Sequence, residues 1–180
     1  MTHDETPAVE PLFSADEIAV RVEAIAAEIA ATMPKDLLIV AILKGGFVFV
    51  ADLIRALHYA GMRLQVDFMT LSSYGAGTES SGHVVITRDI TDDVAGRDVL
   101  IVDDILESGR TISGAQQLLL NRGARTVKLC VLLDKPGKRK VDCAADFIGF
   151  TVEDRFVVGY GLDYAHLFRD LPYIGTIAPT

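Results

Sequence analysis

The stretch that decides the fold is residues 99–111, Val-Leu-Ile-Val-Asp-Asp-Ile-Leu-Glu-Ser-Gly-Arg-Thr. Val99 to Val102 are four consecutive β-formers, which predict a strand buried on both faces of a sheet. Asp103 and Asp104 follow where the strand leaves the sheet, the end at which open α/β sheets bind ligands. The small turn 108–111 opens a helix whose free N–H groups suit phosphate. The stretch therefore predicts a sugar-phosphate site; the alternative is a strand ending in a polar turn with a serine helix cap.

Predicted strands and helices alternate on both sides of this stretch. Residues 14–17 have capping-box spacing before an amphipathic helix expected to end near residue 32. Further strands are expected at 37–43, 64–68, 84–87, 99–102 and 127–133, and further helices at 47–57 and 111–121. This alternation predicts an α/β fold with a mainly parallel central sheet flanked by helices. Two short strands, 147–152 and 156–160, predict a small β-rich hood beside it.

Length and composition fit one domain. The 180 residues are 50% hydrophobic, enough for a full core. We expect a flexible arm at 1–12 and a single domain at 13–180, with a core at about 13–140 and the hood at about 141–180. The net charge of −8 argues against a nucleic-acid surface.

The remaining sequence features concern location. Cys130 and Cys143 lack metal or redox spacing, so a thiol-reducing cytoplasm is the simplest interpretation. No apolar stretch approaches the roughly 18 residues of a membrane helix, and the first residues lack the pattern of a signal peptide. We therefore expect a cytoplasmic protein with no membrane partner.

Two further segments have compositions suited to an anionic ligand. Leu43-Lys44-Gly45-Gly46 follows the first buried strand directly, and its glycines let the backbone approach an anion; an ordinary turn is the alternative. Residues 72–82 form a long Ser/Gly-rich loop without periodicity. This loop is either a plain surface loop or a lid that keeps water from a reacting centre.

Residues 99–111 resemble the phosphoribosyl pyrophosphate (PRPP) motif of the type I phosphoribosyltransferases: a hydrophobic run, two acids, two hydrophobes and a loop ending in Gly-x-Thr. Other segments match motifs of the bacterial-type hypoxanthine and guanine phosphoribosyltransferases in family order from residue 43 to residue 172: 43–46, 73–75, 132–136, 155–164 and 168–172. The resemblance implies the type I phosphoribosyltransferase fold. It also implies purine salvage, in which PRPP and hypoxanthine or guanine give IMP or GMP and pyrophosphate.

The resemblance also assigns a role to each matched residue. It implies that the ribose and 5′-phosphate are bound by Asp103, Asp104, Ser108, Gly109, Arg110 and Thr111, and that pyrophosphate is bound by Leu43, Lys44, Gly45 and Arg169. It further implies that Ser73 and Tyr74 form the lid, and that the purine is bound by Lys135, Phe156 and Val157. It implies Mg²⁺ as the cofactor, held by Asp163 with Asp103 and Asp104. The Leu43-Lys44 peptide would be cis, as is frequent in this family. From the residues alone, Lys135 could be a solvated charge, Phe156 a core residue and Arg169 the partner of Asp170.

The chain departs from the family pattern at two acids. Asp103 stands where Glu is common, and Glu107 stands where an Asp is the proposed general base for purine N7. One added methylene moves a carboxylate by about an ångström or more, while proton transfer needs about 2.6–3.2 Å; we keep Glu107 as the catalytic acid-base group.

Two other functions remain open from the sequence. One is a xanthine-preferring phosphoribosyltransferase, and the other is a PRPP-sensing regulator without catalysis. The expected partners are PRPP, a 6-oxopurine and pyrophosphate, with no nucleic acid. A homo-oligomer, dimer or tetramer, is also expected.

Overall fold

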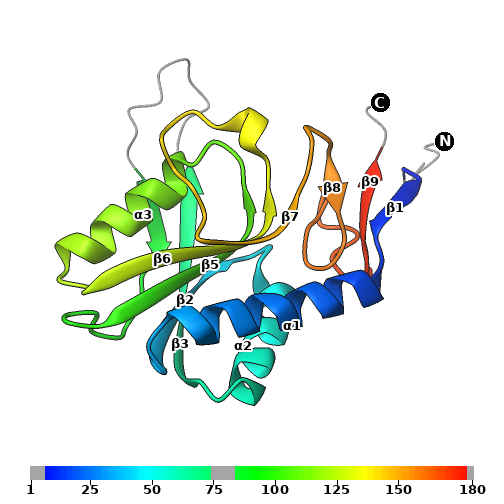
Figure 1. Cartoon of the computed structure of the whole chain (residues 1–180). Helices are drawn as coiled ribbons and strands as arrows, with labels where there is room; N and C mark the ends of the chain where they lie inside the picture. The colour runs from blue at the N-terminus through cyan, green and yellow to red at the C-terminus, as the bar shows by residue number, and fades with distance from the viewer. Residues whose placement is uncertain (1–6, 74–83, 178–180) are drawn as a thin grey trace.

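The chain forms a six-stranded sheet with helices on both faces and a separate three-stranded sheet at one end (Figure 1). The structure is a computed structural model that describes residues 7–73 and 84–177. The larger sheet has the order β4 (Val84–Arg88), β3 (Arg63–Ser73), β2 (Asp36–Leu43), β5 (Asp98–Leu106), β6 (Thr126–Asp134), β7 (Phe147–Thr151). All neighbouring strands are parallel except β4, which runs antiparallel to β3. The expected mainly parallel α/β sheet is confirmed.

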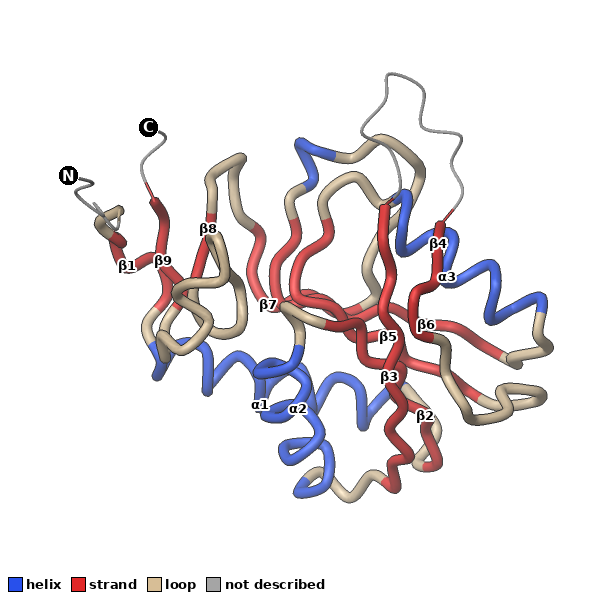
Figure 2. The backbone as a smooth tube through the Cα atoms, turned by 180° about the vertical axis from the view of Figure 1, so that it is seen from behind, coloured by secondary structure: helices blue, strands red, loops and turns tan. Residues whose placement is uncertain are grey.

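Helices α1 (Ala15–Thr32) and α2 (Phe47–Tyr59) cover one face of the sheet, and α3 (Arg110–Asn121) covers the other (Figure 2). Strand β2 shows why the sequences of the central strands are unbroken hydrophobic runs. Its residues Leu37, Ile39 and Ala41 pack in the cluster that includes α1 and α2, and Leu38, Val40 and Ile42 pack in the cluster that includes α3. Because successive side chains of a strand point to opposite faces, a sheet covered on both faces leaves no polar alternation.

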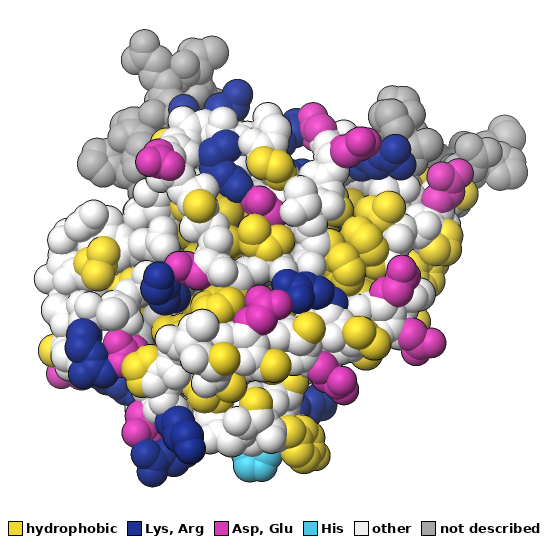
Figure 3. Space-filling view, in the orientation of Figure 1, with side chains coloured by type: hydrophobic (Ala, Val, Ile, Leu, Met, Phe, Trp, Pro, Cys, Tyr) yellow, Lys and Arg dark blue, Asp and Glu magenta, His cyan; other side chains and the backbone are white. Residues whose placement is uncertain are grey.

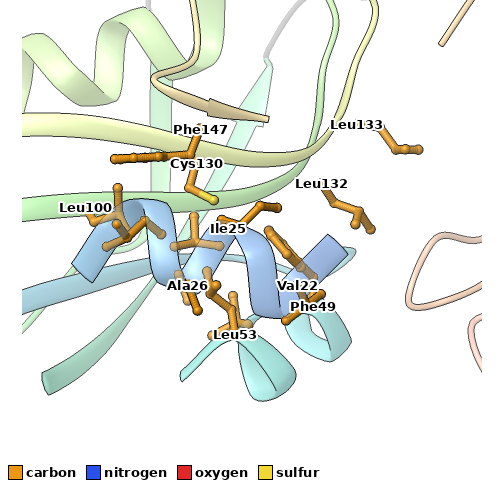
Figure 4. Packing of buried hydrophobic residues seen from close by; sticks show 14 of the residues in the cluster. Val22, Ile25, Ala26, Phe49, Leu53, Leu100, Cys130, Leu132, Leu133 and Phe147 are labelled. Carbon is orange, nitrogen blue, oxygen red and sulfur yellow. The ribbon is translucent and has the colours of Figure 1, made fainter. Parts of the chain in front are cut away.

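The core beneath α1 and α2 fixes both helices on the sheet. Ile25 and Ala26 of α1 and Leu53 of α2 pack with Leu100 of β5 and Cys130 of β6 (Figure 4). Apolar burial of this kind contributes roughly 25 cal/mol for each Å² removed from water. The rigid sheet and helices thus position the loops that leave its carboxyl edge.

The N-terminus of α1 has the capping box expected from the sequence. The Ser14 hydroxyl accepts from the Glu17 backbone N–H at 3.2 Å, and the Glu17 carboxylate accepts from the Ser14 N–H at 2.8 Å. Farther along α1, the Arg21 guanidinium donates to the carbonyls of Ile148 and Gly149 at 2.6 and 2.9 Å. This side chain fastens α1 to the edge strand β7.

The smaller sheet has the order β1 (Val9–Phe13), β9 (Ile174–Ile177), β8 (Val157–Val158), and its pairs are antiparallel. Of the flexible or loosely docked arm expected at residues 1–12, residues 9–11 are docked, because they pair with β9. Pro11, which has no N–H, is tolerated because β1 is an edge strand. Residues 1–6 lie outside the described part of the chain.

Two expectations for the hood need correction. Residues 147–151 form β7, which pairs with β6 and completes the central sheet, so this segment is core and not hood. The strand expected at 156–160 is only Val157–Val158, because Gly159, Tyr160 and Gly161 have φ values of 93°, 51° and 100° and turn the chain away from the sheet. We therefore define the hood as residues 155–177.

The distribution of charge on the surface and the character of the helices concern two classes of partner, nucleic acids and membranes. On the face seen in Figure 3, Lys and Arg side chains are interspersed with Asp and Glu. Within residues 7–73 and 84–177, no helix combines the length and apolar character needed to cross a membrane.

Candidate functional site

The carboxyl ends of β2, β5 and β6 meet at one edge of the sheet, and a cavity of about 430 Å³ opens there. Its lining contains predicted residues from five separate segments: Leu43, Lys44, Gly45, Asp104, Glu107, Lys135, Phe156, Val157, Asp163 and Arg169. A second cavity, of about 250 Å³, is lined by Asp103, Glu107, Ser108, Gly109 and Thr111, among others. The fold therefore brings together residues as far apart as 43 and 169.

Asp103 and Asp104 are the last polar pair of β5, and each carboxylate is oriented by a backbone N–H. Asp103 accepts from the Asp104 N–H at 2.9 Å, and Asp104 accepts from the Ile105 N–H at 2.8 Å. Burial, together with the neighbouring charge of Asp104, raises the pKa of Asp103 well above its ordinary value. Burial also raises the pKa of Asp104, while the charge of Arg169 opposes that rise. The Asp104 carboxylate thus lines the larger cavity and the Asp103 carboxylate the smaller one, and both can accept from hydroxyl donors.

The loop between β2 and α2 approaches these acids closely. The Leu43-Lys44 peptide bond is cis, and Lys44 is exposed. A Cβ placed on Gly45 would lie 1.6 Å from Oδ2 of Asp104. Because no side chain fits at that distance, only glycine lets the loop and the Asp104 carboxylate share this space.

Residues 107–109 connect β5 to α3, and they line the smaller cavity together with Thr111. Gly109 precedes α3 with a φ of 79°, a left-handed conformation that favours glycine. The Ser108 hydroxyl accepts from the Arg110 N–H at 3.3 Å. Thr111 lies in the first turn of α3, where backbone N–H groups and the helix dipole favour an anion.

Two residues that sequence analysis missed hold this loop from outside. Arg139 donates to the Glu107 carbonyl at 2.6 Å and also pairs with Asp134. The Lys140 N–H donates to the Ser108 carbonyl at 2.9 Å. The basic run 138–140 was the available signal, but the two contacts to the loop end on the carbonyls of Glu107 and Ser108, which no sequence pattern marks.

Lys135 and Glu107 form an ion pair inside the larger cavity. Nζ of Lys135 lies 2.8 Å from Oε1 of Glu107, and the lysine side chain is only 6% exposed while that of Glu107 is 47% exposed. The solvated-charge alternative for Lys135 is therefore wrong. A buried ammonium needs a partner, and Glu107 supplies it.

The hood supplies the opposite wall of this cavity. Phe156 is 53% exposed and meets Tyr164 edge to face, with ring centroids 5.7 Å apart. It is therefore not a core residue. Val157 is buried in β8 and also lines the cavity.

Asp163 and Arg169 lie together at the mouth of the cavity. Arg169 Nη2 is 2.7 Å from Asp163 Oδ1, and Arg169 Nη1 donates to the Gly161 carbonyl at 2.6 Å. The ion-pair partner of Arg169 is thus Asp163, and not Asp170 as the alternative had it. The second oxygen of Asp163 accepts from the His166 N–H at 2.9 Å.

Residues 9–165 match the model of the phosphoribosyl transferase domain family. The chain belongs to this family. It is 47% identical over 172 residues to the hypoxanthine-guanine phosphoribosyltransferase of Bacillus subtilis (strain 168). The aligned region covers 93% of this chain and 92% of that protein. Its fold matches the crystal structure of a hypoxanthine phosphoribosyltransferase from Staphylococcus aureus with a TM-score of 0.88 and 42% identity, over 94% of this chain and 91% of that one.

A second similar structure carries a glutamate in place of an aspartate of its family. The glutamic acid mutant of an invariant aspartic acid in hypoxanthine phosphoribosyltransferases matches with a TM-score of 0.89 and 35% identity, over 97% of both chains. A phosphoribosyltransferase fold of this type therefore accommodates a glutamate in place of one family aspartate.

The metal residues implied by the family are not a preformed cage. Across residues 7–73 and 84–177, no three His, Cys, Asp or Glu side chains converge on a point that could hold a metal ion. Asp163 and Asp104 nevertheless both line the larger cavity with carboxylate oxygens, the ligands Mg²⁺ prefers. This donor set suits a metal that takes its other ligands from phosphate and ribose oxygens.

The lid prediction concerns Ser73 and Tyr74. Ser73 is the last residue of β3, and Tyr74 lies outside the described residues. The lid therefore stays a prediction. The cavity lining adds residues that sequence analysis did not select: Thr70, Leu71, Ile105 and Leu162.

Proposed function

We propose that the protein transfers the 5-phosphoribosyl group from PRPP to hypoxanthine and/or guanine, giving IMP or GMP and pyrophosphate. The observation that carries the proposal is that the cavity contains Asp104 and the Lys135–Glu107 pair together. A ribose bound at Asp104 and a purine bound at the Lys135–Glu107 pair would be adjacent, as the attack of the purine on C1′ requires.

On the PRPP side, each chemical part of the substrate has a matching group. Asp103 and Asp104 accept hydrogen bonds from the ribose hydroxyls, and the amides of 108–111 with Thr111 bind the 5′-phosphate. Lys44 and Arg169 balance the charge of the departing pyrophosphate. Most of the catalysis comes from this positioning and charge stabilisation.

On the purine side, Phe156 stacks on the base and Lys135 donates to its 6-oxo group. A lysine ammonium has three N–H donors, so it can bind the oxo group while still paired with Glu107. Glu107 is then close to N7 and accepts its proton. An amino group at position 6 would offer the lysine another donor, which disfavours adenine.

We also propose Mg²⁺ as the cofactor, bound by Asp163 together with oxygens of pyrophosphate and ribose. When bound, it would offset the negative charge of the leaving group. Two free, buried thiols support a cytoplasmic location, while a homo-oligomeric state stays a prediction.

The test is an assay of PRPP with hypoxanthine, guanine, xanthine and adenine in Mg²⁺, following nucleotide formation and pyrophosphate release. We expect turnover of hypoxanthine and/or guanine and loss of activity with EDTA, restored by added Mg²⁺. Preference for xanthine would replace the proposed substrate, and no nucleotide from any base would refute the enzyme.

Lys135→Ala should lower kcat/KM for hypoxanthine and guanine by roughly 10- to 100-fold, because a hydrogen bond to a charged donor contributes about 1.5–3 kcal/mol. The KM for PRPP should change far less. Lys138→Ala is the matched control, since Lys138 pairs with Asp154 and does not line the cavity. Equal losses toward purine and PRPP would contradict the assignment of Lys135 to the base.

A further inference from the structure

We propose that Tyr160 and Asp52 are positioning residues: their hydrogen bond fixes the pyrophosphate-binding part of the hood against α2 and leaves the purine-binding part independent. The proposal rests on the proposed function. Neither residue lines the 430 Å³ cavity, so both act through other groups.

The bond joins two segments that are far apart in sequence. The Tyr160 hydroxyl donates to Oδ2 of Asp52 on α2, and Asp52 Oδ1 pairs with Arg55 one turn later. Tyr160 is buried, and burial together with the hydrogen bond to Asp52 raises the pKa of its hydroxyl. The tyrosine is therefore a neutral donor over the working pH range.

The backbone at Tyr160 needs such a restraint. Tyr160 has a φ of 51° and Gly161 a φ of 100°. A non-glycine residue in this region costs free energy and persists only where surrounding contacts fix it. The hydrogen bond to Asp52 supplies a contact from the side chain, and the Tyr160 N–H supplies another by donating to the Leu171 carbonyl at 2.9 Å.

The fixed turn reaches the site through Gly161. A Cβ on Gly161 would lie 2.3 Å from the Gly45 carbonyl oxygen, so the turn packs directly on the loop 43–46. The Gly161 carbonyl accepts from Arg169, and the Gly161 N–H donates to the Arg169 carbonyl at 3.0 Å. Arg169 in turn holds Asp163. Tyr160 thus controls where Arg169 and Asp163 lie relative to the loop.

The purine-binding part of the hood has a different anchor. Val157 pairs with Thr176 of β9, and the Ile177 N–H donates to the Phe156 carbonyl at 3.2 Å. β9 is itself paired with β1. Loss of the Tyr160–Asp52 bond leaves these contacts in place. It should therefore weaken pyrophosphate binding and leave purine binding unchanged.

The experiment measures two classes of ligand, PRPP or pyrophosphate and purine or IMP, first on the single variants Tyr160→Phe, Asp52→Ala and Asp52→Asn. For Tyr160→Phe and Asp52→Ala we expect the KM for PRPP, and for pyrophosphate in the reverse reaction, to rise about 3- to 10-fold. This is less than the full effect of a hydrogen bond to a carboxylate, because the bond acts on the ligand only through Arg169 and Asp163. The KM for purine and the Kd of IMP should stay within about twofold. Asp52→Asn keeps an acceptor oxygen and should be nearly normal.

Three controls separate positioning from general destabilisation. Arg55→Ala removes the other partner of Asp52, and Tyr59→Phe removes the hydroxyl of a tyrosine that is 88% exposed on the same helix; neither should change any constant. The Tyr160→Phe/Asp52→Ala double variant should be no worse than either single variant, because both remove the same bond. Thermal unfolding midpoints verify that each variant is folded.

Three outcomes would overturn the proposal. They are unchanged PRPP and pyrophosphate constants in folded Tyr160→Phe and Asp52→Ala, equal loss toward IMP, or additive effects in the double variant. If the wild-type protein forms no nucleotide, the proposed function fails as well, so the two failures are distinguishable.

Discussion

Glu107→Gln should lower kcat by about 10²–10⁴, the contribution of a general acid-base group, with little change in PRPP binding. The glutamine side chain is the right probe because its carbonyl oxygen can still accept from Lys135, which lies 2.8 Å from Oε1 in the wild type. The variant therefore removes the ability to take a proton while it keeps the buried ammonium paired. Single-turnover measurement prevents product release from masking the chemical step.

Glu107→Asp is the matched control, because it restores the family residue and keeps the carboxylate. We expect this variant to be active, with part of the contact to Lys135 weakened by the shorter side chain. A loss of less than about tenfold in Glu107→Gln would mean that leaving-group stabilisation dominates and that solvent takes the proton. Wild-type velocity would remove Glu107 from the catalytic residues.

The pairing of Glu107 with Lys135 illustrates what the sequence contained and what it hid. Each residue was predicted separately as a site residue. The register of β5 and β6 pairs Leu106 with Asp134, and Glu107 and Lys135, which follow the two strands directly, form an ion pair. Strand order is a tertiary property, and the sequence alone did not supply it.

The central sheet was predictable because its strands are hydrophobic on both faces and its helices carry clear start signals, such as the capping box at Ser14. The hood was less predictable from the sequence. β1 contains Pro11, a residue that predicts a break, and β9 has only four residues, Ile174–Ile177. Such short strands are specified by each other and not by local propensity.

The contacts that hold the site together were also hidden. Arg139 binds the Glu107 carbonyl, and Tyr160 binds Asp52 across 108 residues of sequence. A carbonyl acceptor leaves no mark in a sequence, and one tyrosine among ordinary core residues gives no signal. Residues that we propose to touch substrate could be selected from motifs, whereas residues that we propose to position them required the fold.

Asp104→Asn should raise the KM for PRPP by roughly 10- to 100-fold, the effect of a lost hydrogen bond to a charged group. The direction follows from the orientation of the carboxylate. Oδ1 accepts from the Ile105 N–H, and Oδ2 faces Gly45 and the cavity. In asparagine the oxygen keeps the backbone bond, so the NH₂ group faces the cavity and presents a donor where a ribose hydroxyl needs an acceptor.

The same substitution should stabilise the fold at neutral pH. Burial raises the pKa of both Asp103 and Asp104, and the charge of Asp104 adds to the rise at Asp103. The folded protein therefore binds these protons more tightly than the unfolded chain does, and this stabilisation is present at acid pH and is lost as the pH rises through the raised pKa values. The substituted asparagine carries no charge, so the variant should have a higher free energy of unfolding at pH 7 than the wild type. Its free energy of unfolding should also fall less than that of the wild type between pH 4 and pH 7.

Asp36→Asn is the control, because Asp36 pairs with Arg63 on the surface at the opposite end of β2. It should leave the KM for PRPP unchanged. Urea unfolding at several pH values, measured beside PRPP kinetics on both variants, provides the comparison. An Asp104→Asn protein that binds PRPP normally would exclude Asp104 as a ribose ligand. One that is weaker toward PRPP but not more stable at pH 7 would show that the buried charge of Asp104 does not destabilise the folded protein.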